Sequence, residues 1–180
     1  MKLLQKRSSA IAVFIVIVVA FTILGMNRSI SKAVKETEEM FYSGGPLAEG
    51  YTERSIDSQL AERMNAALGL VTLANNQTGL EREASAIRDA RQALENADSI
   101  SDKSKANIML TEAVTDLLDS SFDSSSAAAQ NYISSFNGAQ TFIESMAYNK
   151  KVAEFEDSVL PFPLSVLRIF VFAGHAEPFA

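Results

Sequence analysis

The chain has 180 residues, which is enough for one domain and a short additional segment. Its composition, 47% hydrophobic and 21% charged, provides for a packed core and argues against a disordered protein. It contains no cysteine, which excludes disulfides and thiolate metal sites. Its net charge of −6 argues against a nucleic-acid partner, because a phosphate footprint needs clustered Lys and Arg.

The first strong pattern is a run without charges, SSAIAVFIVIVVAFTILGMN, from Ser8 to Asn27. Twenty helical residues extend about 30 Å, the thickness of the hydrocarbon core of a bilayer. We therefore predict a transmembrane anchor in residues 1–27, with the span itself from Ala10 to Met26. A cleaved signal peptide and a buried core helix are the competing interpretations. The length of the run, its uniform Ile, Val and Phe content and its poor cleavage motif favour a retained single span.

Basic residues flank this run on both sides, at Lys2, Lys6 and Arg7 before it and at Arg28, Lys32 and Lys35 after it. Lys and Arg near a span are enriched on its cytoplasmic side. The tight N-terminal cluster favours a cytoplasmic N-terminus. We therefore expect a single-pass protein of the cell membrane whose main domain lies outside the cytoplasm.

The segment after the span keeps a helical pattern but turns polar, from residue 27 to residue 42. We expect the span to continue into it as one helix, with Ile30, Val34 and Phe41 near one stripe. The following SGGPLAEG, residues 43–50, predicts a loop, since adjacent glycines before a proline stop a helix. A phosphate-binding loop is disfavoured there, because no strand precedes it and no Lys-Ser or Lys-Thr ending follows.

A second helical pattern begins near Ser55 and extends to about Leu94. The Asn75–Asn76 pair and Gly79 mark either a break or a weak point in one long helix, and the sequence leaves both open. The TGLE motif at residues 78–81 fits a capping box.

Two further helices are predicted, from about Asp102 to Asp119 with Ser101 as its cap, and from the SSFDSSS loop to about Val159. Nothing in the sequence is typical of a strand. The prediction is an all-α fold in which an N-terminal transmembrane helix continues into an antiparallel four-helix bundle over residues 28–160.

Residues 161–180 form a short apolar C-terminal tail, in which Leu164 to Ala173 are apolar except for Ser165 and Arg168. Ten helical residues cover about 15 Å, too little to cross a bilayer. Up-and-down topology would bring the tail to the membrane-proximal end of the bundle. Packing on the bundle, shallow insertion at the lipid interface and docking to a partner all remain open.

Three segments carry a resemblance to the LemA family. YNKKVAEFEDSVLPFP resembles the family's C-terminal signature, NGAQTFI its GTENRI run, and IDSQLAERMNAALGLV its IDVQL segment. The matching positions, which we interpret as structural, are Ile56, Asp57, Gln59, Leu60, Arg63, Leu70, Val71, Gly138, Ile143, Tyr148, Asn149, Val152, Phe155, Val159, Phe162 and Pro163, with Phe179 as a late aromatic.

The chain also departs from the LemA pattern. Leu68 and Gly69 stand where the family has Pro-Asn, Glu156 replaces its second Asn, and the Gly-rich loop is inserted. The resemblance implies a membrane-anchored antiparallel helical bundle of LemA-like type, and it implies no established catalytic site.

No residue pattern indicates catalysis, a cofactor or a metal site. A single histidine, His175, cannot form a zinc-binding pair, and the carboxylates fall on faces typical of solvated helices. Tyr148 and Asn149 are either packing residues or part of a partner surface. We expect a non-enzymatic scaffold or interaction protein of the cell envelope, whose partners are the lipid membrane and another envelope protein. An extracytoplasmic sensory or ligand-binding bundle is the alternative.

Overall fold

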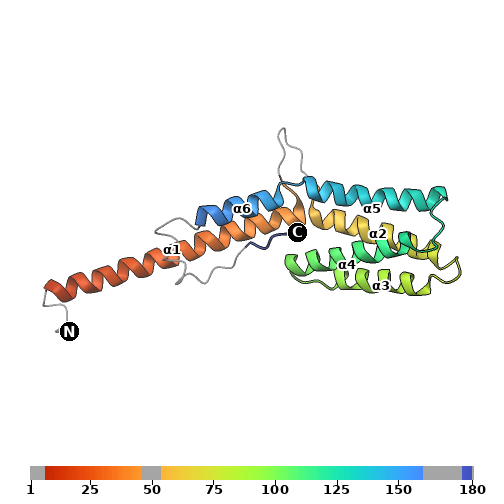
Figure 1. The fold of residues 1–180 in the computed structure, drawn as a ribbon. Helices are drawn as coiled ribbons and strands as arrows, with labels where there is room; N and C mark the ends of the chain where they lie inside the picture. The colour runs from red at the N-terminus through yellow and green to blue at the C-terminus, as the bar shows by residue number, and fades with distance from the viewer. Residues whose placement is uncertain (1–6, 46–53, 160–175, 180) are drawn as a thin grey trace. The chain divides into compact units, whose positions relative to one another are not determined.

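The computed structural model describes residues 7–45, 54–159 and 176–179 (Figure 1). Within these residues every regular element is an α-helix, which confirms the all-α prediction. The helices are α1 (Arg7–Ser43), α2 (Ile56–Ala74), α3 (Glu81–Glu95), α4 (Ile100–Asp119), α5 (Ala127–Ser145) and α6 (Tyr148–Val159). The expected Phe162 and Pro163 of the family signature, and the apolar run 164–173, lie outside the described residues.

The chain divides into two compact units, Met1–Glu38 with Lys151–Ala176 and Glu39–Lys150 with Glu177–Ala180. The first unit contains most of α1, whose segment from Ala10 is long and apolar enough to cross a membrane. No part of its most apolar window is buried, which is inconsistent with a core helix. Phe14, Val16 and Phe21 expose about two thirds or more of their surface, at 66%, 67% and 71%.

The second unit contains the packed helices α2–α5. Helix α5 lies along α2, α4 lies along α3, and α3 also packs on α2, as Figure 1 shows. Short connections make consecutive helices antiparallel, so the predicted antiparallel bundle is confirmed. Its core contains fully buried apolar side chains from three of the helices, among them Leu60, Leu70, Ile87, Leu110 and Leu117.

Serine side chains fix the first turn of three of these helices. Ser55, Ser99 and Ser126 precede α2, α4 and α5, and each hydroxyl accepts a hydrogen bond from the backbone N–H three residues ahead. Such a bond satisfies one of the four N–H groups that a helix start leaves unpaired. The predicted cap Ser101 is therefore wrong: α4 begins two residues earlier than predicted, at Ile100, and Ser101 lies inside its first turn.

The second predicted helix is broken, which settles the question that the sequence left open. Helix α2 ends at Ala74, and α3 begins only at Glu81. Gly79 has a φ of +84°, a left-handed conformation that glycine adopts without the cost other residues meet. The TGLE capping box does not form, because the residue before α3 is Leu80, which makes no side-chain cap hydrogen bond.

The last predicted helix is also divided, and its expected continuity to Val159 is wrong. Helix α5 ends at Ser145, and Met146 takes an extended backbone with a ψ of 142°. The Ser145 hydroxyl donates to the Phe142 carbonyl at 2.7 Å, so a side chain satisfies a carbonyl of the last turn. The four packed helices are therefore α2–α5, and not the four segments that the periodicity had delimited.

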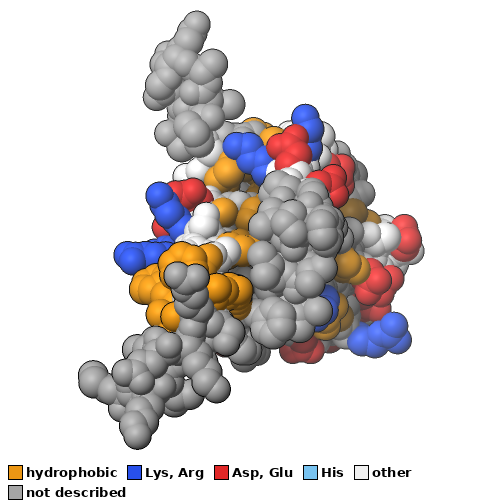
Figure 2. Space-filling view, turned by 90° about the vertical axis from the view of Figure 1, so that its left-hand side faces the viewer, with side chains coloured by type: hydrophobic (Ala, Val, Ile, Leu, Met, Phe, Trp, Pro, Cys, Tyr) orange, Lys and Arg blue, Asp and Glu red, His pale blue; other side chains and the backbone are white. Residues whose placement is uncertain are grey.

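The surface of the molecule mixes charged and apolar areas. Figure 2 shows acidic and basic side chains spread over one face, with hydrophobic side chains gathered in one part of it. Single exposed apolar residues such as Leu68, Ile108 and Met109 are ordinary for a soluble domain, whereas the run on α1 is continuous.

Candidate functional site

Most of the residues that carry the LemA resemblance are buried in the structure. On α2 these are Ile56, Gln59, Leu60, Arg63, Leu70 and Val71, and beyond it they are Ile143, Tyr148 and Val152. Asp57 and Phe155 are half-buried, while Gly138 and Asn149 are exposed. Two of these positions, Arg63 and Tyr148, take part in hydrogen-bonded clusters.

Arg63 lies at the centre of a polar network that joins three helices. Its side chain is fully buried and donates to Asn107 Oδ1 and to Thr111 Oγ1 (2.8 Å) on α4. It also donates to Gln140 Oε1 (2.7 Å) on α5, and its guanidinium carbon lies 4.0 Å from the centre of the Phe136 ring. One cation therefore links α2, α4 and α5 through four side chains.

This network holds a charge without a carboxylate partner in direct contact. Burial lowers the pKa of Arg63 to about 10 from its ordinary value, and the more distant Glu144 opposes that shift. At neutral pH the guanidinium therefore stays protonated. Gln140 donates to Glu144 at 2.8 Å, so the carboxylate acts on Arg63 through the amide between them. The arrangement suits a structural link, since every acceptor on the cation is part of the bundle.

A second cluster surrounds the last described residues of the chain. The Asn149 Oδ1 atom accepts from the Phe179 N–H at 2.9 Å, and the same amide donates to the Phe179 carbonyl. The Tyr148 hydroxyl donates to the Glu177 carbonyl at 2.7 Å. The Glu177 carboxylate accepts from the Ser101 N–H, at the start of α4, at 2.8 Å.

Aromatic rings complete this cluster. Phe41, near the end of α1, is fully buried, and its ring centre lies 5.6 Å from that of Tyr148 and 5.5 Å from that of Phe179. Such separations suit the tilted and edge-to-face contacts that aromatic pairs prefer. We call Phe41, Ser101, Tyr148 and Asn149 together the C-terminal site. All of its residues belong to the second compact unit, as do Glu177 and Phe179.

The C-terminal site borders a charged pair. Lys103 on α4 pairs with Asp57 on α2, and its ammonium group lies 5.3 Å from the ring centre of Tyr42. Asp57 is thus a family-matching residue with a defined partner, at the end of the bundle where α2 and α4 begin.

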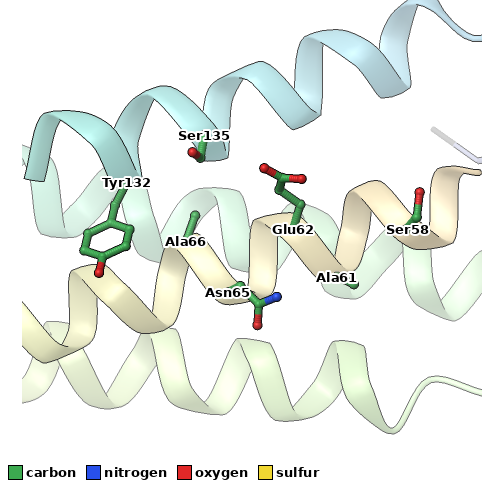
Figure 3. A pocket seen from close by; sticks show the side chains of 7 residues that line it. All are labelled: Ser58, Ala61, Glu62, Asn65, Ala66, Tyr132 and Ser135. Atoms are coloured by element: carbon green, nitrogen blue, oxygen red, sulfur yellow. The ribbon is translucent and has the colours of Figure 1, made fainter. Parts of the chain in front are cut away.

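A groove of about 350 Å³ lies between α2 and α5 (Figure 3). In Figure 3 the Tyr132 ring lies at one end and Glu62 near the middle. The lining residues are Ser58, Ala61, Glu62, Asn65, Ala66, Tyr132 and Ser135. A comparable groove between α3 and α4 is acidic, with Asp89, Glu112 and Asp116. Among the described residues, no group of three His, Cys, Asp or Glu side chains is placed to hold a metal ion.

Gly69, one of the departures from the LemA pattern, allows Tyr132 to pack on α2. A Cβ atom at Gly69 would lie 2.5 Å from the Tyr132 ring, closer than such atoms approach. We expect Gly69→Ala to displace the ring and to lower the free energy of unfolding by about 1–3 kcal/mol, as other overpacked sites do. Thermal denaturation followed by circular dichroism measures this.

Gly138 on α5 provides the matched control, because a Cβ there meets nothing within 4 Å. Gly138→Ala should leave the protein as stable or stabilise it by about 0.5–1 kcal/mol, through better helix propensity. Tyr132→Ala in the Gly69→Ala background should relieve the clash. Equal stability of Gly69→Ala and Gly138→Ala would contradict the packing described.

No family model, no curated protein and no solved structure matches the chain. The resemblance to the LemA family therefore has no support from these comparisons and stays a prediction from the three quoted segments.

Proposed function

We propose that the protein is a single-pass membrane protein that presents a helical bundle of LemA-like type outside the cytoplasm, as a scaffold or interaction module and not as an enzyme. The observation that carries the proposal is the exposure of α1 from Ile11 to Leu24. Each large apolar side chain left in water costs about 1.5–3 kcal/mol relative to burial, and a bilayer removes that cost for the whole run.

The charges of the chain support this assignment. The apolar window of α1 is preceded by basic residues and followed by a mixed polar surface, including the Lys32–Glu36 ion pair at 3.5 Å. A lipid-facing segment followed by a solvated segment of the same helix fits an anchor that leaves the membrane near Met26. The cluster at Lys2, Lys6 and Arg7 favours a cytoplasmic N-terminus.

Membrane extraction tests the anchor directly. We expect the full-length protein to stay in the membrane pellet after alkaline carbonate treatment, and its intact N-terminal peptide to be found by mass spectrometry. The double variant Val16→Asp/Val19→Asp should be released, since each mid-span carboxylate costs about 2.5–3.5 kcal/mol on insertion. Ser29→Asp/Ser31→Asp, in the polar part of the same helix, should remain in the pellet.

Two results would count against the anchor. One is release of the unaltered protein by carbonate, and the other is a mature N-terminus after Met26, which would identify a signal sequence. Protease added to intact, wall-stripped cells tests the orientation, and we expect it to digest residues 54–159. Complete protection of the bundle would place it in the cytoplasm.

The groove between α2 and α5 favours a second candidate, an extracytoplasmic bundle that senses or binds a ligand. Its volume of about 350 Å³ suits a small molecule, and Glu62, Asn65 and Tyr132 offer polar groups. Glu62→Gln and Tyr132→Phe should leave a scaffold role intact, whereas they should weaken any ligand-dependent response.

A further inference from the structure

The end of the chain is held at the C-terminal site by its backbone and by two of its side chains. We propose that the C-terminal site, made of Phe41, Ser101, Tyr148 and Asn149, is a peptide-binding site that recognises an extended Glu-X-Phe segment, and that residues Glu177–Phe179 occupy it as a tethered ligand. The inference is independent of membrane anchorage, since all these residues belong to the second compact unit.

Backbone recognition comes from two neighbouring side chains of α6. Asn149 bonds both the N–H and the C=O of Phe179, as the edge of a β-strand would do. Tyr148 bonds the C=O of Glu177, two residues earlier. Main-chain groups spaced by two residues are read in this way in extended peptides, where they give affinity without dependence on side chains.

Side-chain selectivity comes from the residues on either side of Pro178. The Glu177 carboxylate bonds the N–H of Ser101 in the first turn of α4, where a helix leaves N–H groups unpaired and favours negative charge. Ser99 already covers the N–H of Asp102, so the peptide carboxylate satisfies a different group of the same turn.

The aromatic side chain of Phe179 is the second determinant of selectivity. The Phe179 side chain is 3% exposed and packs on Phe41, which is itself fully buried. Pro178 between the two anchors is exposed. Proline fixes its own φ near −65°, which pre-orders an extended segment and reduces the entropy lost on docking. The recognised sequence is therefore an acidic residue, then any residue with an extended backbone, then an aromatic residue.

Among the described residues, three side chains and one backbone N–H hold this segment, and its attachment to the chain adds to its occupancy. Covalent attachment raises the effective concentration of a ligand to about the millimolar range. A peptide of modest intrinsic affinity thus stays bound in cis, and a second Glu-X-Phe segment at higher effective concentration can replace it. The Glu-X-Phe segment that occupies the site can belong to the same chain or to a second copy of it.

A labelled peptide tests the site in the full-length, detergent-solubilised protein. The double variant Glu177→Gln/Phe179→Ala keeps the site and weakens the tethered ligand. We expect it to bind a fluorescein-labelled peptide of residues 176–180, AEPFA, saturably, and at least about tenfold more tightly than the unaltered protein does, because there the tail competes. The peptide AQPAA should not bind, and adding Asn149→Ala to the double variant should abolish binding.

A measurement on the unaltered chain covers the case in which the double variant fails to fold. With excess AEPFA, the NMR signals of the Phe179 amide and of the Asn149 side chain should move, since the peptide displaces the tail. The proposal is overturned if millimolar AEPFA leaves these signals unchanged, or if a folded double variant binds AEPFA no better than AQPAA.

Mixing two variants separates the sources of the ligand. Asn149→Ala lacks a working site but keeps the tail, and Glu177→Gln/Phe179→Ala keeps the site but lacks a working tail. Their co-elution as a complex, with neither associating alone, supports exchange with a second copy. Separate elution with AEPFA binding retained supports the chain's own tail as the source.

Discussion

Leu60→Asp is expected to unfold the bundle. Leu60 is 2% exposed and lies on α2, the helix that packs against both α5 and α3. The change removes about 1.5–3 kcal/mol of apolar burial and places a carboxyl group where no partner is available. We expect a total loss of about 4 kcal/mol or more, a large fraction of the 5–15 kcal/mol that stabilises a typical domain.

Leu68→Asp is the matched control, because it makes the same substitution on the same helix at a side chain that is 44% exposed. We expect it to change the free energy of unfolding by less than about 1 kcal/mol. Thermal and urea denaturation of the full-length protein, followed by circular dichroism, distinguish the two. Similar losses for both variants would mean that α2 does not pack through the face described.

Arg63→Ala should have the second-largest effect, a loss of about 2–4 kcal/mol. The truncation removes the donor that Asn107, Thr111 and Gln140 share, and an unsatisfied buried acceptor, as Asn107 Oδ1 would become, costs about 1–3 kcal/mol. Gln140 Oε1 keeps the Asn107 amide as a donor, at 3.3 Å. Relief of the buried charge offsets part of this loss. Arg82→Ala, on a side chain that is 93% exposed, should change stability by less than about 0.5 kcal/mol.

Arg63→Lys separates charge from geometry. A lysine keeps the positive charge but lacks the planar fork that reaches two helices at once, so we expect it to recover only part of the loss. The pKa of Arg63, about 10, lies below the ordinary value of an arginine, because burial disfavours the charged form. The arginine is thus charged in both folded and unfolded protein below about pH 9, and the cost of burying it is relieved only as the pH rises through 10. Near neutrality, stability should not vary with pH through this residue. If Arg63→Ala were as stable as the unaltered protein, the network would contribute nothing to the free energy of unfolding.

Periodicity predicted the class of the fold because apolar side chains at helical spacing bury themselves in the same way wherever they occur. It located α4 and the start of α2 to within a few residues. It left the break near Gly79 open, because the same residues fit a weak point in one helix, and it missed the break at Met146, which has neither glycine nor proline to mark it. It placed the cap of α4 at Ser101, whereas Ser99 caps the helix.

The candidate sites were predicted in part. Arg63, Tyr148 and Asn149 were singled out through a resemblance, yet their partners were not. Asn107 lies 44 residues from Arg63, and Glu177 lies 76 residues from Ser101. Such contacts between distant polar residues leave no periodic signal. A charged residue on an apolar stripe, as Arg63 is, was the available sign that α2 needed a polar partner.

The docking of Glu177–Phe179 has a practical consequence for work in cells. A purification tag or fluorescent reporter fused after Ala180 would begin two residues beyond Phe179, whose aromatic side chain is buried. A bulky fusion there would compete with the hydrogen bonds that Asn149 makes to Phe179, and so would alter the state being observed. Reporters inserted within residues 46–53 leave the sequence after Phe179 unmodified. Comparing the molecules bound by the protein with the reporter at each of the two positions would show whether a fusion at the C-terminus changes what the protein binds.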